Sequence, residues 1–230
     1  MINVIIISLK IVASTTIVGE MIRGILPDAE VFCLTPPGMC PGHFDLKPSD
    51  VKKIEDADFI VYQGWEKWVE KIRKRKIKIG IMENLIIPDV HKKAVLKLAD
   101  KIDSIYPGQK MELDNYCRKI DSIKALIRKK AVYLKGKKVI CNVYQKSFLE
   151  WLGLKVIAVY PPEENLNPKL LSEIIKIAKE EKIDLIVDNL QSGEAGKIFE
   201  RELGIKRVAL SNFPTSSYIE TLKENVNKLL

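Results

Sequence analysis

The stretch KVIAVYPPEENLNPKLLSEIIKIAKEEKIDLIVDN, Lys155 to Asn189, decides the fold of this chain. It begins and ends with short apolar runs rich in Val and Ile, a composition that is typical of buried strands. Between the two runs, Pro168 begins a helical pattern that continues to about Lys182, with Lys and Glu on its polar side. A strand, a helix and a second strand in this order predict a parallel sheet.

The same alternation continues on both sides of this stretch, so we expect an α/β fold with two βα lobes and mostly parallel sheets. The MINVIIISLK segment at the start reads either as a first strand or as the stub of a secretion signal. The other expected strands are Lys10–Ser14, Ala29–Leu34, Asp58–Gly64, Lys76–Met82, Lys137–Val143 and Lys206–Ser211.

The middle of the chain reads as helical except for a break at YPGQ, Tyr106 to Gln109. The part from Gln109 to Leu134 would form a helix about 39 Å long at roughly 1.5 Å per residue. We therefore expect an N-terminal lobe over residues 1–89, a bridging helical segment over 90–134 and a C-terminal lobe over 135–230. Ligands in such folds bind at the carboxyl ends of the strands, so we expect a ligand cleft between the lobes.

Composition narrows the class of protein. The net charge is +8, but only one dense basic run occurs, at Lys71 to Gly80, which disfavours nucleic acid as a partner. No apolar window is long enough to span a bilayer. The four cysteines follow no paired spacing, and the sequence leaves open whether Cys33 and Cys40 form a disulfide.

The loop PPGMCPGHFDLKPSD, Pro36 to Asp50, carries the clearest candidate chemistry. Cys40 and His43 lie three positions apart, and thiolate and imidazole are good ligands for zinc, copper and iron. The alternative is that Cys40 is an ordinary buried cysteine and His43 an ordinary surface residue. The only other histidine, His91, falls at a helix start, where we expect it to be solvated.

The sequence does not favour an enzyme. No glycine-rich phosphate loop is present, and two histidines do not assemble a Ser-His-Asp set with the expected partners. Cys40 with His43 as nucleophile and base is the one catalytic arrangement that the residues allow in principle.

Three segments carry a family likeness. The segment HFDLKPSDVKKIEDADFIVYQG, His43 to Gly64, resembles the H-x-F/Y-E-x-x-P-S-D…ADLVFYNG signature of the solute-binding proteins of zinc and manganese ABC importers. The ending ALSNFPTSSYIETLKENVNKLL, Ala209 to Leu230, resembles their SDxLG…TYLxMMxxNxxxL ending. The segment Gly153 to Asn189 resembles the part of the second lobe that precedes it. The likeness extends over most of the chain from about Lys10, and it implies two lobes bridged by a long helix.

The resemblance also implies ligand positions. In the family, metal is held by three His and an acidic residue, and the first His falls on Gly42, one position from His43. Cys40 stands where the family usually has an Asp. The second and third His fall on Glu83 and on Asn142 beside Cys141, and the acidic ligand falls on Asn212. The candidate metal ligands are therefore Cys40, His43, Glu83, Cys141, Asn142 and Asn212.

The function that this resemblance implies is the substrate-binding component of a metal-ion ABC transporter, which delivers its ion to a membrane permease. The expected cargo is a transition-metal ion, zinc first, with manganese, iron and copper as alternatives, and we expect a monomer. Two other readings stay open: the same fold binding a metal chelate or small organic ligand, and an intracellular metal- or redox-responsive protein. As a transporter component, the protein is expected outside the cytoplasm, in the periplasm or at the cell surface, if a signal precedes this sequence. If Met1 is the true start, it is cytoplasmic.

Overall fold

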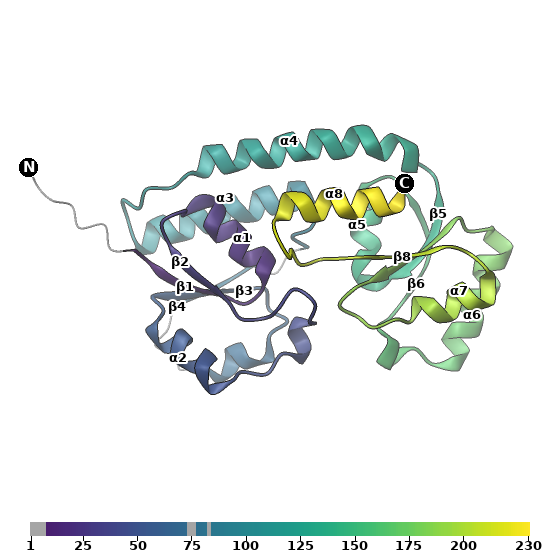
Figure 1. Ribbon diagram of the computed structural model, residues 1–230, viewed down its shortest axis with the longest axis horizontal. Coiled ribbons are helices and arrows are strands. Elements are labelled where there is room, and N and C mark those ends of the chain that lie inside the picture. Colours follow the sequence, from purple (N-terminus) through teal and green to yellow (C-terminus); the bar gives the residue numbers. More distant parts are fainter. Residues whose placement is uncertain (1–7, 73–76, 82–83) are drawn as a thin grey trace, which may run out of the picture. The chain divides into compact units, whose positions relative to one another are not determined.

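The structure, a computed structural model, describes residues 8–72, 77–81 and 84–230 (Figure 1). The expectation of a first strand or a signal stub at the start of the chain concerns residues that are mostly outside these ranges. The candidate ligand Glu83 also lies outside them.

The described residues form strands and helices in the alternating order that the sequence predicts. The strands are β1 (Lys10–Ala13), β2 (Glu30–Cys33), β3 (Phe59–Tyr62), β4 (Ile77–Gly80), β5 (Lys138–Asn142), β6 (Lys155–Tyr160), β7 (Leu185–Asn189) and β8 (Arg207–Leu210). The α-helices are α1 (Thr16–Ile25), α2 (Pro48–Asp56), α3 (Pro88–Ile105), α4 (Leu113–Ala131), α5 (Lys146–Trp151), α6 (Pro168–Glu181), α7 (Gly196–Leu203) and α8 (Tyr218–Leu229). Short 3-10 turns are η1 (Pro41–His43), η2 (Lys67–Lys71), η3 (Val132–Leu134), η4 (Val143–Gln145) and η5 (Glu163–Asn165).

The chain divides into two compact units. Unit 1 consists of Met1–Leu85 and Asp89–Ile120, and unit 2 consists of Ile86–Pro88 and Asp121–Leu230. The division falls inside α4, so this helix contributes residues to both units, and it lies within the segment 90–134 to which the sequence assigns the bridging role.

Unit 1 contains a four-stranded parallel sheet in the order β2-β1-β3-β4. Its central strands are apolar and fully buried at Ile11, Val12, Phe59 and Ile60. Figure 1 shows α1 and α2 on opposite faces of this sheet, as right-handed crossovers in a parallel sheet require. Because every strand pair in this sheet is parallel, all four strands have their carboxyl ends at the same edge.

Unit 2 contains a second four-stranded parallel sheet, in the order β6-β5-β7-β8. The stretch that decides the fold forms β6, α6 and β7, and α6 begins at Pro168 as the sequence indicates. The Asn167 side chain caps this helix by accepting a 3.0 Å hydrogen bond from the backbone N–H of Leu170. Figure 1 shows α6 and α7 side by side, and the two helices are in contact. The expected α/β class with two parallel sheets is thus confirmed.

The predicted long helix is shorter than expected. It begins at Leu113 instead of Gln109 and ends at Ala131, so its 19 residues span about 28 Å at roughly 1.5 Å per residue. The reason is visible at its start, where the backbone N–H of Glu112 donates a 2.9 Å hydrogen bond to the carbonyl oxygen of Ile25 at the end of α1. That contact holds the preceding residues out of the helix.

Two further expectations are settled by the side chains. All four cysteines are free thiols, so Cys33 and Cys40 form no disulfide. The expectation that His91 is solvated is wrong, because its side chain is fully buried within unit 1. Within the described part of the chain, no helix combines the length and the apolar character needed to cross a membrane.

Candidate functional site

Amide side chains gather at the carboxyl ends of the strands in unit 2. Asn142 ends β5, Asn189 ends β7, and Asn212 follows β8 by two residues. Because β7 lies between β5 and β8 in the sheet, these three positions are neighbours along one edge. Gln145, in the turn that follows β5, completes the group, which we call the amide edge: Asn142, Gln145, Asn189 and Asn212.

Gln145 joins the amide edge together. Its Nε2 donates hydrogen bonds of 3.0 Å each to the Oδ1 atoms of Asn189 and Asn212. The same Nε2 lies 3.5 Å from the backbone carbonyl oxygen of Leu210, which can only accept. These contacts fix the orientation of the Gln145 amide, with its nitrogen toward β8. Asn189 is held in turn by a hydrogen bond from its Nδ2 to Ser192 Oγ.

Two polar atoms of the amide edge have no hydrogen-bond partner among the described residues. The Asn142 Oδ1 accepts from the backbone N–H of Tyr144 at 3.1 Å, so the opposite atom is the donor Nδ2, and it is unpaired. The unpaired atom of Gln145 is the acceptor Oε1. Both side chains are fully buried, and leaving a buried polar atom unpaired costs about 1–3 kcal/mol. In native proteins such atoms pair with an ordered water, an ion or a ligand.

The ionisable side chains beside the amide edge are committed elsewhere. Burial raises the pKa of the Cys141 thiol to about 12, so at neutral pH this residue is a protonated core side chain of β5. Asp188, one residue before Asn189, is buried and accepts hydrogen bonds from the Tyr160 hydroxyl, at 2.8 Å, and from the Arg207 guanidinium, at 2.5 Å. The amide edge itself is therefore electrically neutral.

Unit 1 has a comparable strand-end group made of hydroxyls and one amide: Ser14, Thr15, Thr35 and Gln63. These residues follow β1, β2 and β3 within two positions and are all buried. Thr15 Oγ1 donates to Gln63 Oε1 at 2.8 Å, whereas Ser14 Oγ and Thr35 Oγ1 are unpaired within the described ranges. Glu66 is occupied, because its carboxylate accepts from the backbone N–H groups of Gln63 and Gly64. This edge too presents no free carboxylate.

Cys40 and His43 lie in one tight turn of unit 1. The backbone N–H of His43 donates a 3.0 Å hydrogen bond to the carbonyl oxygen of Cys40, which closes the turn η1. Cys40 is half-buried and His43 is exposed. A Cβ added at Gly42 would stand 3.8 Å from the Cys40 Sγ, an ordinary van der Waals contact. Both residues thus lie on one backbone turn, and we call this segment the Cys40–His43 turn.

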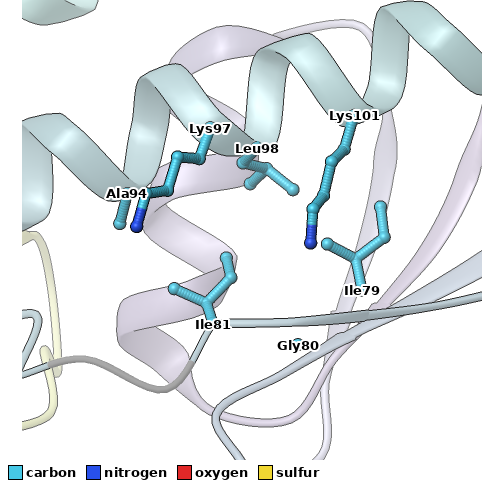
Figure 2. Close-up of a pocket in the computed structure, with 7 residues that line it drawn as sticks. All are labelled: Ile79, Gly80, Ile81, Ala94, Lys97, Leu98 and Lys101. Atoms are coloured by element: carbon cyan, nitrogen blue, oxygen red, sulfur yellow. The ribbon is translucent and has the colours of Figure 1, made fainter.

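Unit 1 also holds a pocket of about 290 Å³ between β4 and α3 (Figure 2). Its floor is apolar, Lys97 and Lys101 of α3 also line it, and Figure 2 shows Lys101 extending from α3 toward Ile79. Ammonium groups repel a metal cation, so we do not assign the cargo to this pocket.

The sequence-predicted ligands fall into separate groups. The structure brings Cys40 and His43 onto one turn, and it brings Asn142 and Asn212 onto one edge, where Gln145 connects to Asn212. Cys141 precedes Asn142 but belongs to the core. Across the described residues, no three or more His, Cys, Asp or Glu side chains form a group that could hold a metal ion. The predicted role of Glu83 stays a prediction.

Sequence reasoning missed Gln145 and Asn189. The available signal for Asn189 was its place directly after the apolar run of β7, because polar residues that follow a buried parallel strand stand at the ligand-binding edge. Gln145 gave no such signal, since its position depends on the turn η4.

Comparisons with known proteins agree with this fold. The family described as zinc-uptake complex component A, periplasmic (ZnuA), matches residues 11–230. A putative metal-binding protein of Thermotoga maritima is 27% identical over 86% of this chain and 83% of its own length. A ZnuA deletion mutant with zinc bound superposes with a TM-score of 0.82 at 17% identity, covering 97% of each chain. FpvC, a solute-binding protein of Pseudomonas aeruginosa in complex with Mn²⁺, gives a TM-score of 0.78 at 18% identity, covering 96% of this chain and 97% of its own.

The family match covers both units, which confirms the expected class of function, the substrate-binding component of a metal-ion ABC transporter. The chain belongs to the family of zinc-uptake complex component A, the periplasmic component of zinc uptake.

Proposed function

We propose that this protein captures a transition-metal cargo, zinc first, outside the cytoplasmic membrane and delivers it to the permease of an ABC importer. Membership of the zinc-uptake family supports the class of cargo and the location. Related folds with zinc and with Mn²⁺ bound support a divalent transition metal.

The Cys40–His43 turn carries this proposal. It lies in the loop that leaves the carboxyl end of β2, and ligands in α/β folds bind outside the carboxyl ends of the strands. Its thiol and imidazole are the side chains that zinc prefers, and its partial exposure leaves them accessible to an incoming ion. The 3.0 Å backbone hydrogen bond fixes both residues on one turn before any ion arrives, which lowers the entropy cost of binding.

Equilibrium dialysis against zinc, manganese, iron(II) and copper(I), each alone and with a small chelator, tests the proposal. We expect stoichiometric binding of at least one form. The double variant Cys40→Ser/His43→Ala removes both soft ligands and should weaken that binding by roughly tenfold or more, because a tenfold loss corresponds to about 1.4 kcal/mol.

Cys33→Ser is the matched control, because Cys33 is also half-buried but lies in β2, where its sulfur contacts Arg23. It should retain wild-type affinity. Wild-type protein that binds none of the metals in either form would overturn the proposed function.

A further inference from the structure

The amide edge of unit 2 is the part of the protein whose chemistry fits a bare metal ion least. Zinc and its neighbours in the periodic table are held by thiolate, imidazole and carboxylate groups. The four side chains of the amide edge are neutral, the Cys141 side chain is fully buried in β5, and Asp188 is taken by Arg207 and Tyr160. A cargo that contacts this edge must be recognised through hydrogen bonds.

The two unpaired atoms specify what those hydrogen bonds are. Asn142 Nδ2 is a donor, because its Oδ1 is occupied by the backbone N–H of Tyr144. Gln145 Oε1 is an acceptor, because its Nε2 is occupied by Asn189, Asn212 and the carbonyl of Leu210. A cation would gain from the acceptor but would be repelled by the donor, and a simple anion would meet the reverse problem. A molecule that carries an acceptor and a donor satisfies both atoms.

Exposed residues adjoin the amide edge along the chain. Val143, Tyr144 and Leu190 are 42%, 45% and 51% exposed, and Asn212 is half-buried. Asn142 and Gln145 flank Val143 and Tyr144 in sequence, and both side chains are themselves buried. The amide edge stands at the carboxyl end of a parallel sheet, a common position for small-molecule sites.

Resting on the proposed function, we propose that the cargo is not a bare ion but a metal complex of a small hydroxy- or aminocarboxylate, whose organic part the amide edge binds. A carboxylate oxygen of the chelator accepts from Asn142 Nδ2, and its hydroxyl or amino group donates to Gln145 Oε1. The neutrality of the edge is then a requirement, because an aspartate there would repel the carboxylate. The resemblance to zinc and manganese importers places a His and an acidic ligand at the positions of Asn142 and Asn212. Binding of the chelator by hydrogen bonds accounts for the amides at these two positions.

Isothermal titration calorimetry of wild-type protein is the first test. The probes are zinc alone, zinc with excess citrate, malate or histidine, and each chelator alone. We expect at least one complex to bind tenfold or more tightly than zinc alone and than its free chelator. The complex with tricarballylate, which is citrate without the hydroxyl donor, should bind at least fivefold more weakly than the citrate complex if citrate is preferred.

Asn142→Asp is the second test. It keeps the oxygen that accepts from Tyr144, replaces the Nδ2 donor by an anionic acceptor, and should weaken binding of the preferred complex tenfold or more. Asn167→Asp is the matched control, because it makes the same change in charge at an exposed helix cap where Asp serves as well as Asn. It should leave affinity unchanged, and circular dichroism establishes that both variants are folded.

The outcomes separate this inference from the proposed function. If zinc alone binds as tightly as every complex, or if Asn142→Asp binds the preferred complex as wild type does, the inference is overturned while metal capture stands. A chelator that binds equally well without metal also overturns it. If Asn142→Asp does not fold, the comparison of probes on wild-type protein decides alone. Failure of every probe overturns the proposed function itself.

Discussion

The hydrogen bonds and the pKa of His91 are set by its buried surroundings. Its Nδ1 lies 3.0 Å from the carbonyl oxygen of Leu85 and must donate to it, and its Nε2 lies 3.0 Å from the Tyr116 hydroxyl, from which the neutral ring accepts. These contacts fix the ring against α4 and the segment that precedes α3. Burial lowers the pKa of His91 from 6.5 to about 4, and burial likewise raises the pKa of Tyr116.

This histidine makes stability depend on pH. The unfolded chain takes up a proton near pH 6.5, whereas the folded chain resists it until about pH 4, so stability is full above 6.5 and falls as the pH drops toward 4. Between pH 7.5 and 4.5 we expect a loss of about 2 to 3 kcal/mol from this group in the free energy of unfolding by urea. His91→Asn should lower stability at pH 7.5 and lose this part of the pH dependence. An equal pH dependence in wild type and variant would contradict the assignment.

At the scale of elements, helix starts are set by short-range contacts that can be tested singly. The Ser217 hydroxyl caps α8 by accepting a hydrogen bond from the backbone N–H of Glu220 at 3.2 Å. Ser217→Ala should lower the free energy of unfolding by about 1 kcal/mol, measured by denaturant titration. Ser216→Ala, one residue earlier and exposed, should change it by less than about 0.5 kcal/mol. Equal effects of the two changes would show that the cap does not stabilise the helix.

The difference between local patterns and long-range contacts explains which helices, strands and site residues the sequence could predict. Apolar runs and helical periodicity are local, so β6, α6, β7 and the other parallel strands follow from the pattern. The start of α4 does not, because it depends on a hydrogen bond from Glu112 to Ile25, far away in sequence. For the site, Asn142 and Asn212 follow from the family likeness, whereas Gln145 becomes part of it only through three contacts to distant residues.

Whole-molecule stability should report cargo binding. A ligand at 100 times its dissociation constant adds about 2.7 kcal/mol, and for a chain of this size about 2–4 °C accompany each kcal/mol. Zinc, alone or with citrate, should therefore raise the melting temperature by about 5 to 10 °C, read by differential scanning fluorimetry. Excess EDTA should reverse the shift. A melting temperature that neither addition changes would contradict binding to the folded protein.

The amide edge has a consequence for how cargo leaves. None of its four side chains gains or loses a proton between about pH 4 and pH 10. Acidification, which releases ions from histidine and carboxylate sites, therefore has no protein group of the amide edge to act on. Release of the proposed metal complex from this edge therefore requires either protonation of the chelator itself or loss of its hydrogen bonds to Asn142 and Gln145.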